Sequence, residues 1–172
     1  MTYKELTIDT ILFVTLIIAV ITDLKTRKIY DKLTIPVAII GLALNAVFFQ
    51  FAGIKNSAIG WVVGVAIFMI FGLGGGDVKL LGAVGALKGW LFTLTSVMYI
   101  GIAGGFFVVI YLIWKGQMLK TLTNSFNMFF KRSEFKKKEA ERIYLPYGPM
   151  ILIGIVWNYL AINYGILSLF KY

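Results

Sequence analysis

The sequence predicts an all-α membrane protein, a polytopic bundle of six transmembrane helices with both termini outside. Of its 172 residues, 59% are hydrophobic and only 15% are charged, a composition that soluble globular domains rarely have. Apolar runs recur along most of the chain, and each is long enough to cross a hydrocarbon core of about 30 Å, which takes roughly 20 helical residues. Lysine and arginine are concentrated in two segments, which sets the direction of threading.

Hydropathy divides the chain into five strongly apolar spans and one weak span. In chain order the spans cover residues 6–22, 33–52, 57–73, 78–90, 91–114 and 149–170. The weak span, 78–90, contains Lys79, Lys88 and three glycines, so we expect it to face protein or water rather than lipid. Its small residues would also let neighbouring helices approach closely. Residues 1–172 are expected to form a single transmembrane domain.

Two basic segments predict the orientation. Residues 24–32 and 115–144 together hold twelve lysines and arginines, whereas the opposite side of the predicted bundle holds three. Short cytoplasmic loops accumulate these residues, so both segments are expected inside, and segment 115–144 is expected to lie along the cytoplasmic interface. This topology accounts for the net charge of +9, and no nucleic-acid partner is expected.

The chain contains neither cysteine nor histidine. That excludes disulfides, thiolate nucleophiles, Ser-His triads and the usual zinc ligands. No metal and no cofactor are therefore expected. Any enzymatic chemistry has to come from carboxylates, lysine, tyrosine or hydroxyl groups.

Two aspartates are predicted at the same depth of the membrane. Asp23 follows the first span, and Asp77 follows three consecutive glycines after the third span. Both spans run from outside to inside, so both carboxyls reach the cytoplasmic face. Two carboxyls brought together in a partly dehydrated site share one proton and act as acid and base on one water, which is what an aspartyl protease requires. Glu5 and Asp9, at the outer end of the first span, have no such arrangement.

Each of these acids also has a simpler explanation. Asp23 fits a helix-end residue paired with a nearby basic side chain, and Asp77 fits an N-cap after a glycine turn. Asp31, preceded by Tyr30, invites comparison with the YD motif of presenilin-like intramembrane proteases, which also use a GxGD string. However, Asp31 lies among lysines in a loop, so we expect it to serve as a loop or helix-cap residue that points away from the site.

Three segments resemble the motifs of the type IV prepilin peptidase family, and their order and spacing agree across nearly the whole chain. The segments are Asp23-Leu24-Lys25-Thr26-Arg27-Lys28-Ile29-Tyr30-Asp31-Lys32-Leu33-Thr34, Gly74-Gly75-Gly76-Asp77-Val78-Lys79-Leu80-Leu81 and Pro146-Tyr147-Gly148-Pro149. The departure from the family pattern is Tyr30-Asp31, which stands where Pro-Asn is usual.

The resemblance implies that Asp23 and Asp77 are the catalytic pair and that Gly74 and Gly76 support Asp77. Lys79 matches a lysine that commonly follows this aspartate, and its role stays open. Three further residues are implied to shape the start of the last helix, since proline fixes φ and glycine permits a tight turn: Pro146, Gly148 and Pro149.

The reaction implied by the resemblance is hydrolysis of one peptide bond in a prepilin or pseudopilin precursor. The cut would fall between a short basic leader and a hydrophobic helix, at the cytoplasmic face of a bacterial or archaeal plasma membrane. The chain resembles the compact, Tad-type or archaeal form without the zinc domain, with membrane lipids as its other partners. Two other interpretations stay open: a presenilin-like protease, and a small transporter or scaffold that uses Asp23 and Asp77 as ion or proton sites.

Overall fold

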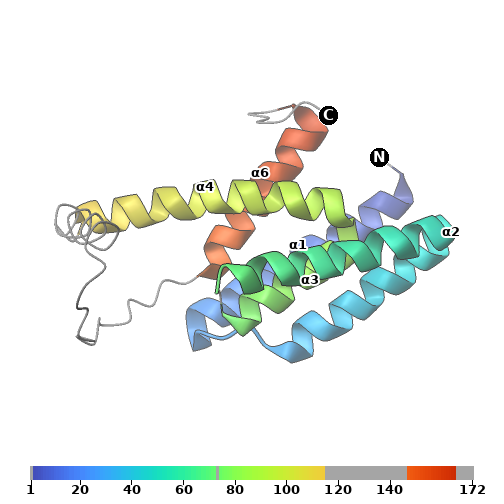
Figure 1. The fold of residues 1–172 in the computed structure, drawn as a ribbon, viewed down its shortest axis with the longest axis horizontal. Coiled ribbons are helices and arrows are strands. Elements are labelled where there is room, and N and C mark those ends of the chain that lie inside the picture. Colours follow the sequence, from blue (N-terminus) through green and yellow to red (C-terminus); the bar gives the residue numbers. More distant parts are fainter. Residues whose placement is uncertain (1, 73, 115–146, 166–172) are drawn as a thin grey trace.

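A computed structural model describes residues 2–72, 74–114 and 147–165 of the chain. These residues form five α-helices, so the all-α prediction is confirmed (Figure 1). The helices are α1 (Tyr3–Thr26), α2 (Asp31–Ile70), α3 (Gly75–Lys88), α4 (Trp90–Trp114) and α6 (Tyr147–Tyr164). The basic segment 115–144, Pro146 and the end of the last predicted span lie outside the described residues.

Helix α2 contains a sharp reversal rather than one straight axis. Gln50 leaves the helical region of the backbone, with φ 54° and ψ −141°, and the two arms of α2 fold back side by side (Figure 1). A Cβ on Gly53 would overlap the carbonyl oxygen of Asn45, so this glycine allows the tight turn. The two arms cover most of the second and third predicted spans, although span 33–52 runs past the reversal at Gln50 and span 57–73 runs past the end of α2.

Helix α3 is the most enclosed element. Six of its side chains are at most 1% exposed: Leu80, Leu81, Ala83, Val84, Ala86 and Leu87. Its backbone touches that of α2 directly, because a Cβ on Gly60 or Gly85 would overlap the main chain of the opposite helix. The expectations that the weak span 78–90 faces protein and lets helices approach closely are therefore confirmed.

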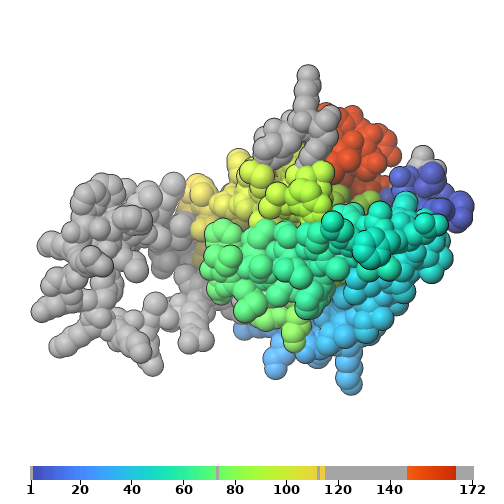
Figure 2. All heavy atoms as spheres, turned by 45° about the vertical axis from the view of Figure 1, so that its right-hand side comes forward, coloured from blue at the N-terminus to red at the C-terminus, as the bar shows by residue number. Residues whose placement is uncertain are grey.

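Helices α4 and α6 cross against this core. A Cβ on Gly154 would lie 2.6 Å from the Cα of Ile100, so the two backbones meet at that point. The buried amide of Asn158 also joins the helices, donating to the Phe92 carbonyl oxygen at 3.1 Å and to the Ser96 hydroxyl at 2.8 Å. On the face shown in Figure 2, the second arm of α2, drawn teal to green, forms much of the surface.

Three of the described helices are long and apolar enough to cross a membrane: α1, α2 and α4. The outer surface of the bundle is correspondingly apolar. Phe51, Ile70 and Phe106 are between 70% and 81% exposed. Contiguous apolar surface of this kind is costly in water and favourable in lipid, so the chain is an all-α membrane protein.

Candidate active site

Asp23 lies in the last turn of α1, where its side chain is buried. The helix ends at Thr26 because Arg27 adopts the left-handed conformation, with φ 56° and ψ 32°. The backbone N–H of Arg27 donates to the carbonyl oxygen of Asp23 at 2.8 Å, which closes this turn. The chain is thereby redirected towards α2, across the beginning of α3.

Asp77 lies in the first turn of α3, and the glycines before it bring this turn close to the loop between α1 and α2. A Cβ on Gly76 would lie 3.0 Å from the Cβ of Ile29 and 3.1 Å from its carbonyl oxygen. Gly74 is the N-cap of α3, and a Cβ there would lie 3.1 Å from Oδ2 of Asp77. The simpler explanation of Asp77 as the N-cap is therefore wrong, since Gly74 holds that position.

The two aspartates line one cavity of about 740 Å³. Its lining comes from the last turn of α1, the loop that follows, and the starts of α2 and α3. The lining residues are Asp23, Arg27, Lys28, Ile29, Tyr30, Asp31, Lys32, Gly74, Gly75, Gly76 and Asp77. The shared cleft expected from the matching depths of Asp23 and Asp77 is therefore present.

The carboxyl of Asp77 is electrostatically perturbed. Burial raises its pKa to about 6, and the negative charge of Asp23 adds to the effect. Among the residues that the structure describes, none donates a hydrogen bond to this carboxyl or forms an ion pair with it. Asp77 therefore holds a proton more readily than an ordinary aspartate does.

Asp23 is held by the last helix. The backbone N–H of Gly148 donates to Oδ2 of Asp23 at 2.8 Å. A Cβ on Gly148 would lie 2.8 Å from the same oxygen, so a larger residue would displace the carboxyl. Sequence analysis gave Gly148 only a turn-shaping role and missed this contact, because nothing local indicates a bond across 125 positions. Pro149 follows in the first turn of α6, where a helix needs no N–H donor.

Asp31 is the first residue of α2, and its carboxylate pairs with Lys79 of α3, Oδ2 to Nζ, at 2.6 Å. Both side chains are exposed, at 54% and 46%. The N-cap of α2 is Tyr30, so the expected loop or cap role of Asp31 is wrong, and Asp31 lines the same cavity rather than pointing away from it. The short connection from α1 brings the start of α2 over that of α3, where Lys79 attracts the carboxylate. Among the described residues, Asp31 is the one ion-pair partner of Lys79.

Comparison with known proteins gives one family. The model of the type IV leader peptidase family matches residues 10–111, more than half of the chain. A prepilin leader peptidase/N-methyltransferase of Burkholderia pseudomallei strain 1026b is 34% identical over 107 residues, 56% of this chain and 34% of the relative. A protein of the same description from Escherichia coli K12 is 33% identical over 93 residues, 48% of this chain and 41% of the relative.

A third such protein, from Pectobacterium carotovorum, is 26% identical over 154 residues, which is 83% of this chain and 47% of the relative. The chain thus spans about a third to a half of the length of the curated relatives that it matches. No solved structure gives a significant match. The family match includes both Asp23 and Asp77, the two carboxyls of the shared cavity. The chain belongs to the type IV leader peptidase family.

Proposed function

We propose that this chain is an aspartyl endopeptidase that removes the leader peptide from prepilin-like precursors at the cytoplasmic face of a membrane. The observation that carries the proposal is the cavity shared by Asp23 and Asp77, two carboxyls that come from helices far apart in the sequence. Membership of the type IV leader peptidase family and similarity to prepilin leader peptidase/N-methyltransferases support the same reaction.

The surroundings of the two carboxyls suggest different protonation states. The raised pKa of Asp77, about 6, favours the protonated acid. Asp23 accepts a hydrogen bond from the N–H of Gly148, and such a donor stabilises a carboxylate anion. We therefore assign the proton to Asp77 and the negative charge to Asp23 in the resting site.

This assignment gives a balanced hydrolysis. Asp23 takes a proton from a water molecule as the water oxygen attacks the carbonyl carbon of the scissile bond, while Asp77 donates its proton to the carbonyl oxygen. The resulting gem-diol collapses, the C–N bond breaks, and the leaving amine takes the proton held by Asp23. The hydroxyl proton of the gem-diol returns to Asp77, so both acids regain their starting states.

Gly74 and Gly76 suit the approach of a peptide substrate. Gly74 is exposed at the cavity edge, and neither residue places a Cβ between the substrate backbone and Asp77. Lys79 holds the carboxylate of Asp31 at one side of the cavity. We assign Lys79 and Asp31 to the electrostatics of the cavity rather than to the chemical step.

The charges around the cavity support a cytoplasmic site in a plasma membrane. Arg27, Lys28 and Lys32 line the cavity, and basic residues of short loops stay on the cytoplasmic side. With six spans crossing the membrane, both termini would lie outside, and residues 1–172 would form one transmembrane peptidase domain. The leader of a precursor would reach the carboxyls from the cytoplasm while its hydrophobic helix remains in the lipid. The proposal is limited to peptide cleavage and does not extend to methyl transfer.

A direct test is to incubate the purified chain, in lipid nanodiscs, with candidate prepilins and to determine the new N-terminus by mass spectrometry. We expect one cut at the junction of the basic leader and the hydrophobic helix. Asp77→Asn should not cut, whereas Asp31→Asn should retain much of the activity, because Asp31 is an exposed residue paired with Lys79. Cleavage by Asp77→Asn together with inactivity of Asp31→Asn would instead identify Asp31 as the essential acid.

A further inference from the structure

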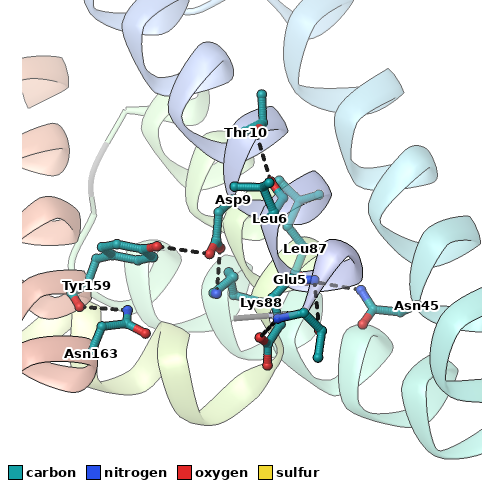
Figure 3. Close-up of polar contacts among 10 residues, drawn as sticks. Glu5, Leu6, Asp9, Thr10, Asn45, Leu87, Lys88, Tyr159 and Asn163 are labelled. Atoms are coloured by element: carbon teal, nitrogen blue, oxygen red, sulfur yellow. Dashed lines mark hydrogen bonds and ion pairs between the residues drawn. The ribbon is translucent and has the colours of Figure 1, made fainter.

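A second group of charged side chains lies at the other end of α1. Asp9, expected from the sequence to be an ordinary residue at the end of the first span, is only 3% exposed. Its Oδ1 pairs with Nζ of Lys88 at 2.6 Å, and its Oδ2 accepts a hydrogen bond from the Tyr159 hydroxyl at 3.1 Å. Figure 3 shows Lys88 and Tyr159 converging on Asp9 from different helices. We call these three residues the polar clamp.

The clamp is enclosed by aromatic rings. Nζ of Lys88 lies 5.2 Å from the ring centroid of Phe92 and 5.7 Å from that of Tyr159. The ring of Phe13 packs edge-on against that of Tyr159, with 5.1 Å between the ring centroids. Asp9 is thus removed from water, whereas the Lys88 side chain is 19% exposed. An ion pair with a buried member is costly to desolvate and is weak evidence for stability. The clamp is more informative about geometry, because its ion pair and hydrogen bond are directional and fix one relative arrangement of the helices.

The clamp joins helices that also form the candidate active site. On α1, Asp9 and Asp23 are fourteen residues apart, about 21 Å along the axis. On α3, Asp77 and Lys88 are eleven residues apart, about 16 Å along the axis. The ion pair of Asp9 with Lys88 therefore lies at one end of these two helices and the two cavity carboxyls at the other.

The third helix follows the same arrangement. On α6, Gly148 and Tyr159 are also eleven residues apart, about 16 Å along the axis. Gly148 binds Asp23 at the cavity, and Tyr159 binds Asp9 at the clamp. All three helices therefore contribute one residue to each end.

We propose that Asp9, Lys88 and Tyr159 are positioning residues that set the axial register of α1, α3 and α6 and thereby the spacing of Asp23 and Asp77. Side chains of α2 donate hydrogen bonds to carbonyl oxygens near the end of α3, so α3 is already fixed along α2, and the clamp acts between this pair of helices and α1 and α6. The clamp opposes sliding of α3 along α1, since such a shift would separate Lys88 from Asp9. The link to catalysis rests on the function proposed above.

The absence of native cysteine permits a test that is independent of cleavage. Spin labels are attached to cysteines introduced at Leu24, which is 58% exposed beside Asp23, and at Gly75, where an added Cβ meets nothing within 4 Å. The distance between the labels is measured by electron paramagnetic resonance in nanodiscs. The background chain is compared with one carrying Asp9→Asn and Lys88→Met together, which leaves no unpaired buried charge.

We expect the distribution of distances between the labels to shift or broaden in the double variant. In unlabelled protein it should lower kcat about a hundredfold, since a displacement of about 1 Å far from the chemistry costs this much, while KM changes less than about twofold. Tyr159→Phe, which removes one hydrogen bond, should have a smaller effect in the same direction. Glu5→Gln is the matched control: it neutralises an exposed acid one turn from Asp9 and should alter neither measurement.

An unchanged distance distribution in the double variant would overturn the clamp, even if its cleavage were slow. If the wild-type chain cleaves no precursor, the proposed function fails, and the label distances still decide whether the clamp sets the register. Asp9→Glu, in a chain that keeps Lys88, restores the carboxylate of the ion pair. Its kcat should be higher than that of the double variant, and its distribution of label distances should be narrower. Failure of this conservative variant to recover either property would also contradict the proposal.

Discussion

The two ends of the bundle surround their acids with opposite kinds of neighbour. At the clamp, Asp9 is matched by an ammonium group and a hydroxyl, and an aromatic ring lies beside the ammonium. At the cavity, Asp77 has no ion pair or hydrogen bond from the described residues and lies near the charge of Asp23. One carboxyl is satisfied by its surroundings, and the other is left able to exchange a proton.

This difference indicates how an acid with a structural role can be distinguished from one with a chemical role. A matched ion stabilises one arrangement of helices and gains nothing from contact with water. An unmatched acid beside a second carboxyl costs stability, and sites of this kind are typical of catalysis. The partners of Asp9 come from α3 and α6, so the contrast with Asp77 depends on neighbouring elements and not on α1 itself.

The largest expected effect is loss of cleavage on changing the acids of the cavity. Asparagine preserves the shape of aspartate but cannot exchange a proton, so Asp23→Asn and Asp77→Asn should each lower the cleavage rate at least about a thousandfold. Because the two acids act on one water, the double variant should be scarcely slower than either single variant. Rates are measured with wild-type amounts of folded protein. A double variant far slower than both singles would show that the acids act independently.

The next effect is on folding and concerns the clamp. Lys88→Met leaves the carboxylate of Asp9 buried without its cation, which should destabilise the protein by about 3–5 kcal/mol. Changing Asp9→Asn and Lys88→Met together should cost much less, since no lone charge remains. Thermal unfolding in one detergent measures both. Asp77→Asn should not destabilise the protein. If Lys88→Met and Asp77→Asn lowered the free energy of unfolding equally, the distinction between the two ends would be lost.

Gly148→Ala should disturb the cavity without disturbing the clamp. The added methyl would lie 2.8 Å from Oδ2 of Asp23, so the carboxyl must move. We expect about a hundredfold loss of kcat, the cost of a displacement of about 1 Å. Gly105→Ala is a suitable control, because an added Cβ there meets nothing within 4 Å. Similar kcat values for the two variants would show that the bond from Gly148 to Asp23 does not matter for the reaction.

The all-helical class and the two cavity acids could be predicted from sequence because they depend on local signals. Hydropathy predicted apolar helices, and the structure confirms an all-α membrane protein. The cleft expected between Asp23 and Asp77 corresponds to the cavity that they share. The burial of α3 also followed, from glycines and lysines that lipid would not accept. These features are readable because each is determined within one helix and its immediate flanks.

The remaining features depend on contacts between distant segments. The bond from Gly148 to Asp23 and the pairing of Asp9 with Lys88 and Tyr159 involve residues 79 to 150 positions apart. Asp31 was expected to face away, since its sequence neighbours are lysines, yet its partner is Lys79 of α3. Neither residue type nor spacing specifies which lysine pairs with which acid, so these contacts required the structure.

The exposed pair of Asp31 with Lys79 sharpens the comparison, because its N to O distance of 2.6 Å equals that of the buried pair of Asp9 with Lys88. Water screens the exposed charges, so Asp31→Asn should change the free energy of unfolding by less than about 1 kcal/mol. Chemical denaturation of Asp31→Asn and Lys88→Met in parallel measures the contrast. A loss above about 3 kcal/mol for Asp31→Asn would show that burial is not the deciding variable.

The smallest expected effect is a change in proton affinity at the cavity. The pKa of Asp77 is raised to about 6 by burial first and by the charge of Asp23 second, so Asp23→Asn should lower it only partly. Infrared titration of the carboxyl stretch, with Asp77→Asn to identify the band, measures the shift.

The raised pKa of Asp77 also predicts how the cleavage rate depends on pH. Cleavage by the wild-type chain should decline as the pH rises through about 6, since Asp77 then loses the proton it must donate. Asp9→Asn, which breaks the clamp at the other end of α1, should also lower the pKa of Asp77 slightly, because a more distant Asp23 repels the second charge less. An upward shift would contradict both the clamp and the shared site.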